Sequence, residues 1–235
     1  MSTSLTRWGA QGLRYGPWRG QAGIAYLAPR LGAPAATVET VTEACARLAG
    51  NGFGRVITAA LDPSEAEGFL AAGFEVREHL HVLIRGTDDP PVAAEVATRR
   101  ARRVDRATVL AVDAAAFPTF WRLDEAGLDE ALAATPTARF RVGIGDGAEV
   151  VAYAIWGRAG RRGYLQRLAV DPARQRAGYG TTLVVDGLRW LHRRGGDSAV
   201  VNTQMANQPA LALYEHLGFR RRPEGLVVLQ ADLVP

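Results

Sequence analysis

A strand, a glycine-containing turn and a helix follow one another directly in the segment LAVDPARQRAGYGTTLVVDGLRWL, and this order constrains the fold more than any other feature. The apolar strand ends at Val170, Pro172 makes a turn, and residues 178–194 have the spacing of an amphipathic helix. Backbone N–H groups at such a helix start converge on one point, where the helix dipole adds positive charge. Glycine has no side chain to hold a phosphate away from the backbone. The segment therefore predicts an α/β fold with an anion site at residues 175–181.

Two other kinds of phosphate-binding loop do not fit these residues. A Walker A loop requires Gly-Lys-Ser/Thr, and the dinucleotide-binding fingerprint requires G-x-G-x-x-G; here the residues read Q-R-A-G-Y-G. A second motif follows further along the chain, with Asn207, Ala210, Leu213-Tyr214-Glu215 and Gly218-Phe219.

Together the two motifs resemble the Q/R-x-x-G-x-G/A and N-x-x-A-x-x-L-Y-E-x-x-G-F signatures of the GNAT (GCN5-related) N-acetyltransferase superfamily, over about residues 95–233. In length and layout this part is also similar to the ribosomal-protein N-terminal alanine acetyltransferases. The resemblance implies a GNAT fold, in which a mixed central sheet is splayed between two strands and carries helices on both faces.

The resemblance also implies acetyl-CoA as the co-substrate. The strand that ends at Val170 should pair with the pantetheine arm through its backbone, the turn should hold the pyrophosphate, and Asn207 should bind the arm near its thioester. The implied cofactor-binding residues are Leu168, Ala169, Val170, Gln175, Arg176, Ala177, Gly178, Tyr179, Gly180, Thr181 and Asn207.

The implied reaction is direct attack of a primary amine of a protein, a peptide or a small molecule on the thioester. Tyr214 stands where the family often keeps a general acid, with a core tyrosine packed under the sheet as the alternative. Gln166 and Arg167 occupy the strand on which many relatives carry a carboxylate base. Water relayed by Glu149, or a carboxylate from residues 113–125, remains open as the base. The alternative function is a non-catalytic acyl-CoA-binding sensor or interaction module.

The acceptor is expected to meet an apolar wall. Phe117, Phe120 and Trp121 lie between the first two helices of this region, where relatives line the acceptor groove, and they could also simply pack the helix turn. Gln166 is assigned to the acceptor side with them. A site without a dedicated base favours an α-amine, whose pKa of about 7.8 leaves it partly neutral near pH 7, over a lysine amine at about 10.4.

Apolar spacing and cap residues predict the order of elements in the C-terminal part. Helices are expected at 104–116, 125–135, 178–194 and 208–217, with Asp124 capping the second. Strands are expected at 138–145, 149–159, 163–170, 198–204 and 226–233.

The first 85 residues look like a partial repeat of the later ones. FLAAGF at 69–74 matches YEHLGF at 214–219 at an offset of 145 (218 − 73). No counterpart of QRAGYG is present, Phe69 replaces Tyr214, and Asp62 replaces Asn207. We therefore expect a degenerate GNAT-like lobe without a CoA loop at 1–85, a linker at 86–94 and the catalytic domain at 95–235.

Composition limits the remaining partners. Cys45 is the only cysteine and the four histidines are scattered, so no metal is expected. The net charge of +4 suits a polyanionic cofactor. The run RRARR at 99–103 has no interleaved aromatic residues, and we do not expect a nucleic-acid partner. No apolar run approaches the ~20 residues of a membrane span, so we expect a cytoplasmic monomer or homodimer without membrane contact.

Overall fold

A computed structural model describes residues 7–8, 12–30, 32–92 and 96–233. The chain forms two compact units: the first contains Met1–Val82, Thr203–Ala206 and Arg222–Pro235, and the second contains Leu83–Asn202 and Asn207–Arg221. Segments of the two units alternate along the chain, so the units are not simply successive. The boundaries at 86–94 stay a prediction about independent folding, and residues 93–95 lie outside the described part.

The second unit is built on a mixed sheet. Its strands follow the order β10 (Ser198–Gln204), β9 (Arg162–Val170), β8 (Val150–Ala159), β7 (Thr137–Ile144) and β6 (Thr98–Arg100). The last two residues of β10 belong to the first unit. β9 and β10 run parallel, whereas the pairs from β9 to β6 are antiparallel. The structure thus confirms the expected mixed sheet.

The sheet opens between β9 and β10. Their pairing covers only Ser198–Val200 against Arg162–Tyr164. Within the described chain, residues 165–170 of β9 have no partner on β10, so their backbone groups on that side are available to a ligand. This is the splay that the GNAT resemblance implies.

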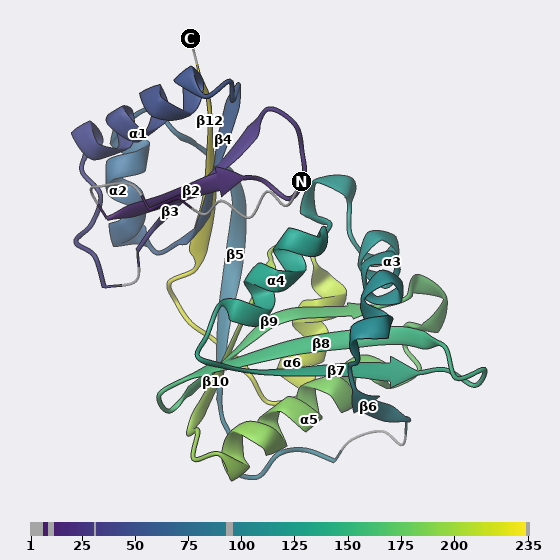
Figure 1. Ribbon diagram of the computed structural model, residues 1–235. Coiled ribbons are helices and arrows are strands. Elements are labelled where there is room, and N and C mark those ends of the chain that lie inside the picture. The colour runs from purple at the N-terminus through teal and green to yellow at the C-terminus, as the bar shows by residue number, and fades with distance from the viewer. Residues whose placement is uncertain (1–6, 9–11, 31, 93–95, 234–235) are drawn as a thin grey trace. The chain divides into compact units, whose positions relative to one another are not determined.

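Helices cover both faces of this sheet (Figure 1). Ala154 and Trp156 of β8 belong to the core under α5 (Tyr179–Arg193) and α6 (Gln208–His216), whereas Tyr153 and Ile155 belong to the core under α3 (Arg106–Ala116) and α4 (Glu125–Ala133). Alternate residues of a strand point to opposite faces, which is why one fully apolar strand supplies both cores.

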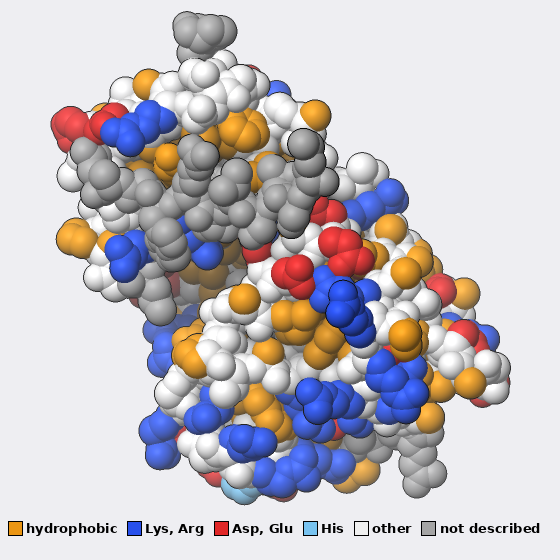
Figure 2. All heavy atoms as spheres, in the orientation of Figure 1, with side chains coloured by type: hydrophobic (Ala, Val, Ile, Leu, Met, Phe, Trp, Pro, Cys, Tyr) orange, Lys and Arg blue, Asp and Glu red, His pale blue; other side chains and the backbone are white. Residues whose placement is uncertain are grey.

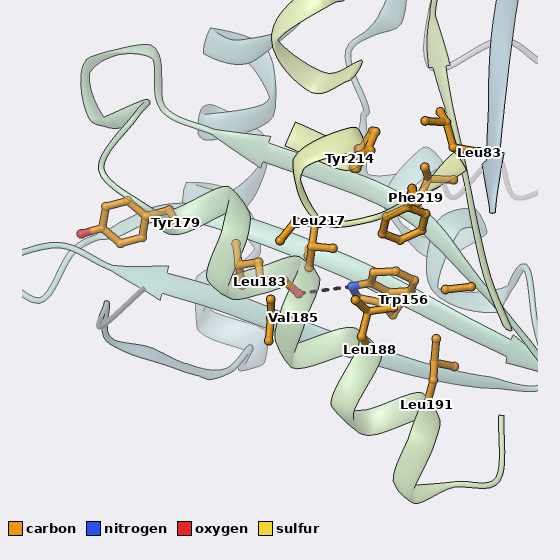
Figure 3. Packing of buried hydrophobic residues seen from close by; sticks show 14 of the residues in the cluster. Leu83, Trp156, Tyr179, Leu183, Val185, Leu188, Leu191, Tyr214, Leu217 and Phe219 are labelled. Atoms are coloured by element: carbon orange, nitrogen blue, oxygen red, sulfur yellow. Dashed lines mark hydrogen bonds between the residues drawn. The ribbon is translucent and has the colours of Figure 1, made fainter. Parts of the chain in front are cut away.

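The contact of α5 with the sheet depends on a glycine. Trp156 is fully buried, and its indole N–H donates to the carbonyl of Leu183 at 3.3 Å (Figure 3). A Cβ added at Gly187 would overlap this indole. Both elements are rigid, so the overlap cannot be relieved without moving the helix or the ring.

Gly187→Ala is therefore expected to destabilise the protein by about 1–3 kcal/mol, as overpacking of a core does. Thermal unfolding measures the effect as a lower midpoint. Gly50→Ala is the matched control, because Gly50 ends α1 (Val38–Gly50) and an added Cβ there meets nothing within 4 Å. Equal midpoints for the two variants would contradict the tight packing at Trp156.

The first unit has its own core and a set of neighbouring strands. Its strands follow the order β1 (Arg7–Trp8), β2 (Leu13–Pro17), β3 (Ile24–Pro29), β4 (Arg55–Leu61), β12 (Leu226–Asp232) and β5 (Glu75–Gly86). β5 runs on into the second unit from Leu83. The two helices α1 and α2 (Pro63–Ala71) share one core with this sheet, formed around Leu27, Leu48, Phe69 and Leu229.

The internal repeat is visible in structural detail. The order β3–α1–β4–α2–β5 corresponds to β9–α5–β10–α6–β12, and β3 pairs with β4 in parallel as β9 does with β10. α2 and α6 lie 145 residues apart at both ends (208 − 63 and 216 − 71). Asp62 and Asn207, which cap these helices with their side chains, have the same offset.

The last strand does not complete the sheet of the second unit. β12 pairs antiparallel with β4 on one side and with β5 on the other, both within the first unit. In the second unit, β11 (Arg220–Arg221) pairs instead with Leu83 and Ile84 at the end of β5. Residues 226–233 were predicted as a strand of the later domain, and nothing in their sequence indicates that they pair with β4 and β5.

The linker expected at 86–94 begins as ordered structure. The Thr87 side chain is buried, and its hydroxyl donates to the carbonyl of Gly196 at 2.5 Å. The Thr87 backbone N–H donates to the backbone carbonyl of Asp197 at 3.1 Å. Residues 83–87 are therefore a structural part of the second unit.

Candidate active site

The turn between β9 and α5 has the backbone conformation that the sequence predicts. Asp171 accepts the Ala173 N–H at 2.9 Å and closes a 3-10 turn at Pro172–Arg174. Arg176 and Gly178 follow with φ of +63° and +89°. Gly178 is the N-cap of α5 and provides no side-chain cap, so the first N–H groups of the helix are not satisfied by a cap side chain. These groups are the donors that an anion requires.

A pocket of about 480 Å³ lies at this turn. Its lining combines the end of β9, the start of α5 and one side of α6. The predicted cofactor residues in the lining are Leu168, Ala169, Val170, Gln175, Arg176, Gly178, Tyr179, Gly180, Thr181 and Asn207. Ala177 is the predicted cofactor residue that does not line it.

One face of α6 forms a wall that sequence reasoning missed. Pro209, Ala212, Leu213 and His216 line the pocket at helical spacing, and Asn207 stands at the start of the helix. The Asn207 side chain accepts the Ala210 N–H at 3.3 Å, so it also caps α6. These residues recur at the 3- and 4-residue spacing of a helix face. The buried face of α6 has the same spacing, so the sequence alone does not distinguish the pocket face from the buried face.

The electrostatics of the pocket suit an anion. Among the described residues that line it, Arg174, Arg176 and His216 are basic and none is an aspartate or glutamate. The Arg174 guanidinium forms an ion pair with Glu149 at 3.2 Å, whereas Arg176 has no carboxylate partner in the described chain. Figure 2 shows further arginine side chains spread over the visible face of the second unit.

Tyr179 is largely a packing residue. It is 8% exposed, and its ring lies under Gly143, where an added Cβ would touch it. Its hydroxyl donates to the Ile144 carbonyl at 3.2 Å. The residue therefore ties the start of α5 to β7 while its edge lines the pocket.

Tyr214 is a residue of α6 that packs into the core of the second unit, and it is not part of the pocket lining. It is 5% exposed and packs edge-on against Phe219, with ring centroids 5.8 Å apart (Figure 3). Burial raises the pKa of its hydroxyl well above the usual value, so the group stays protonated at neutral pH. The counterpart Phe69 packs against Phe74 in the same way in the first unit.

The predicted acceptor residues occupy different places. Phe117 lines the pocket. Phe120 and Trp121 form an edge-on pair 4.9 Å apart in the 3-10 turn Thr119–Trp121, outside the lining. Gln166 is the extra residue where the register of β8 and β9 shifts, and it too lies outside the lining.

The carboxylates considered as a base have other partners. Asp113 is fully buried and ion-paired with Arg167 at 2.7 Å. Asp124 caps α4 by accepting the Gly127 N–H at 2.7 Å, and Glu125 pairs with Arg106. Glu149 pairs with Arg174. None of these carboxylates lines the pocket.

The one cysteine of the chain belongs to the first unit. Burial raises the pKa of the Cys45 thiol to about 11, so it is protonated near pH 7, and it belongs to the core of the first unit. Among the described residues, no group of three or more His, Cys, Asp or Glu side chains could hold a metal ion. No helix in the described ranges is long and apolar enough to cross a bilayer.

A splayed sheet, a glycine-containing turn at a helix start and a pocket along α6 together define an acyltransferase architecture. Residues 107–219 match the family model described as the acetyltransferase (GNAT) family, and this part of the chain belongs to that family. The GNAT resemblance drawn from the two motifs is confirmed.

Known proteins match either a short segment or the fold. N-alpha-acetyltransferase 30 of Homo sapiens is 44% identical over 61 residues, which cover 26% of this chain and 17% of that protein. Mycothiol acetyltransferase of Catenulispora acidiphila is 46% identical over 55 residues, which cover 23% of this chain and 18% of that protein. Each match therefore spans less than a fifth of the relative.

Solved structures agree over nearly the whole chain. A tandem GNAT protein from the clavulanic acid biosynthesis pathway has a TM-score of 0.68 at 13% identity, over 95% of this chain and 79% of that one. A GCN5-related N-acetyltransferase from Sphaerobacter thermophilus has a TM-score of 0.63 at 15% identity, over 95% and 78%. At these identities the likeness concerns the fold alone.

Proposed function

We propose that this chain transfers an acetyl group from acetyl-CoA directly to a primary amine. One observation carries the proposal: a single pocket joins the unpaired end of β9, the amide-rich turn at 175–181 and Asn207 at the start of α6. An extended ligand arm that ends in a diphosphate would use all three. Isothermal calorimetry with CoA and acetyl-CoA tests binding, and thiol release with a panel of amines and peptides tests transfer.

Each part of the pocket has a role in this proposal. Backbone groups of Leu168–Val170 pair with the pantetheine arm as an added strand would. The N–H groups at the start of α5 and the guanidinium of Arg176 bind the pyrophosphate. A backbone N–H near Leu168 donates to the thioester carbonyl and stabilises the oxyanion as the amine attacks.

An α-amine is the acceptor class that these residues favour. In the part of the chain that the structure describes, no carboxylate lines the pocket to deprotonate the amine. An α-amine has a pKa about 2.6 units below that of a lysine amine, which makes its neutral form less costly by roughly 3.5 kcal/mol near pH 7. The name of one relative, N-alpha-acetyltransferase 30, refers to an α-nitrogen. A protein or peptide N-terminus and a small-molecule amine both fit this class.

Tyr214 is proposed as the general acid for the departing sulfur, a role that requires its hydroxyl to reach the sulfur from the core next to the pocket, because Tyr214 is not part of the pocket lining. Its raised pKa keeps the proton on the hydroxyl, although a weaker acid donates less readily. Tyr214→Phe is expected to lower the turnover rate at saturating acetyl-CoA by about 100-fold, the lower end of what a positioned acid contributes. Acetyl-CoA affinity should stay the same, because the ring packing is kept.

Tyr15→Phe serves as the matched control, since Tyr15 packs on the core of the first unit. It should leave the rate unchanged. An unchanged rate in Tyr214→Phe would assign Tyr214 to the core alone, as Phe69 is in the first unit.

The second candidate is a non-catalytic acyl-CoA sensor, which the absence of a carboxylate from the described pocket lining favours. It predicts binding of acetyl-CoA without thiol release across a broad amine panel. The first unit is proposed to bind no CoA, and a cytoplasmic monomer or homodimer stays a prediction.

A further inference from the structure

A buried ion pair joins the strand of the proposed donor site to α3. Arg167, one residue before Leu168 on β9, donates from Nε to Asp113 Oδ2 at 2.7 Å and from Nη2 to Oδ1 at 3.0 Å. Asp113 is fully buried and the Arg167 side chain is 12% exposed. A buried pair of this kind requires that its remaining polar atoms find partners.

The remaining partners of Asp113 lie on two other elements. The Leu123 N–H donates to Oδ1 at 2.7 Å, and the Tyr153 hydroxyl donates to Oδ2 at 2.5 Å. Each carboxylate oxygen therefore accepts two hydrogen bonds. Asp113 fixes the end of the 117–123 segment, and both of its carboxylate oxygens are engaged by groups of the protein itself.

The guanidinium of Arg167 holds the start and the middle of the same segment. Its Nη2 donates to the Trp121 carbonyl at 2.8 Å, and its carbon lies 3.5 Å from the centre of the Phe117 ring. Within the segment, the Trp121 N–H donates to the Pro118 carbonyl at 2.8 Å, the Arg122 N–H to the Thr119 carbonyl at 3.3 Å and the Arg122 Nε to the Phe117 carbonyl at 3.1 Å. The ion pair adds contacts from outside the segment, at Phe117, Trp121 and Leu123.

This segment borders the pocket at the start of the proposed cofactor strand. Ala116 and Phe117 line the pocket beside Leu168, which follows Arg167 directly. An amine that approaches a thioester near Leu168 therefore enters a pocket that Phe117 helps to line. A displacement of the segment would change where the acceptor sits and leave the turn at 175–181 in place.

We infer that Asp113 and Arg167 are positioning residues that hold residues 117–123, and through them the Phe117 side of the pocket that the acceptor enters, an inference that rests on the proposed transferase function. Arginine is required, since one planar fork makes the bidentate pair, reaches the Trp121 carbonyl and stacks on Phe117. Lysine keeps the charge but has no such fork.

Arg167→Lys tests the inference, with Arg139→Lys as the matched control. Arg139 makes an equivalent two-bond pair with Asp186, at 2.7 and 2.8 Å, between β7 and α5 and outside the pocket lining. The probes are acetyl-CoA and short peptides that differ in their first residue. Arg167→Lys should raise the KM for the best peptide by between about 10-fold and 100-fold, as displaced substrates do. Its acetyl-CoA affinity should stay within about 2-fold of the parent, and Arg139→Lys should change neither value.

Hydrogen exchange gives a readout that needs no acceptor. Arg167→Lys and Asp113→Asn should each speed exchange of the Trp121 and Leu123 amides, and Arg139→Lys should not. Unchanged exchange, an unchanged peptide KM, or parallel losses of peptide and acetyl-CoA binding would overturn the positioning role. Absence of acetyl-CoA binding by the parent protein would instead end the proposed function, while the exchange result would still decide whether Arg167 holds the segment.

Discussion

Replacement of Gly178 by alanine together with Gly180 by valine is expected to weaken acetyl-CoA binding by at least about 100-fold. Gly178 has a φ of +89°, a conformation that costs an L-residue roughly 1–2 kcal/mol. A Cβ at Gly180 would already lie 3.1 Å from the side chain of Leu213, so a valine extends into the pocket. A 100-fold loss corresponds to about 2.7 kcal/mol, which calorimetry resolves readily.

The control for this variant is Gly195→Ala. Gly195 follows α5 with a φ of +72°, and a Cβ there meets nothing within 4 Å. It carries a similar backbone strain far along the helix from the pocket, so thermal stability should fall while acetyl-CoA affinity is retained. If the variant with Gly178→Ala and Gly180→Val binds acetyl-CoA as tightly as the parent protein does, the turn does not hold the diphosphate.

A fragment that starts at residue 95 is expected to be less stable than the second unit in the full chain. It keeps β12 but lacks β4 and β5, the two strands that β12 pairs with. It also loses the pairing of β11 with the end of β5. Leu83 is fully buried in the core of the second unit, and full burial of such a side chain stabilises by about 1.5–3 kcal/mol. The loss of Leu83 alone is a large part of the net stability of a domain, about 5–15 kcal/mol.

Circular dichroism and gel filtration of the 95–235 fragment would measure the effect. The matched control is the full chain cut by an inserted protease site after Asp89, where the chain is exposed. Its two pieces should stay associated, since pairing of β12 with β4 and β5 remains intact. A soluble, cooperatively unfolding 95–235 fragment with full activity would show that the first half is dispensable, in line with the sequence-based boundaries.

Local signals in the sequence were sufficient for most elements. Apolar spacing and caps located α5, α6 and the strands beside them, and Asp124 caps α4 as expected. The short strands β1, β2, β6 and β11 were not predicted, because two to five residues give too little periodicity. The position of β12 could not be predicted either, since it is decided by contacts with strands far away in the sequence.

The candidate site also has one part that the local sequence predicts and another part that it does not predict. The turn at 175–181 could be predicted because its glycines and its helix start are adjacent in sequence. The Asp113–Arg167 pair could not, because its members are 54 residues apart and nothing in either local sequence names the partner. The same holds for His216, whose exposure to the pocket depends on how α6 is rotated against the sheet.

The location of β12 has a consequence for synthesis on the ribosome. Strands β3, β4 and β5 of the first unit precede residues 226–232 in the chain, and until those residues are made its sheet has a gap between β4 and β5. All segments of the second unit, which end at Arg221, are translated before this gap can be filled. Synthesis of the first unit therefore starts before that of the second unit, but its sheet is completed later.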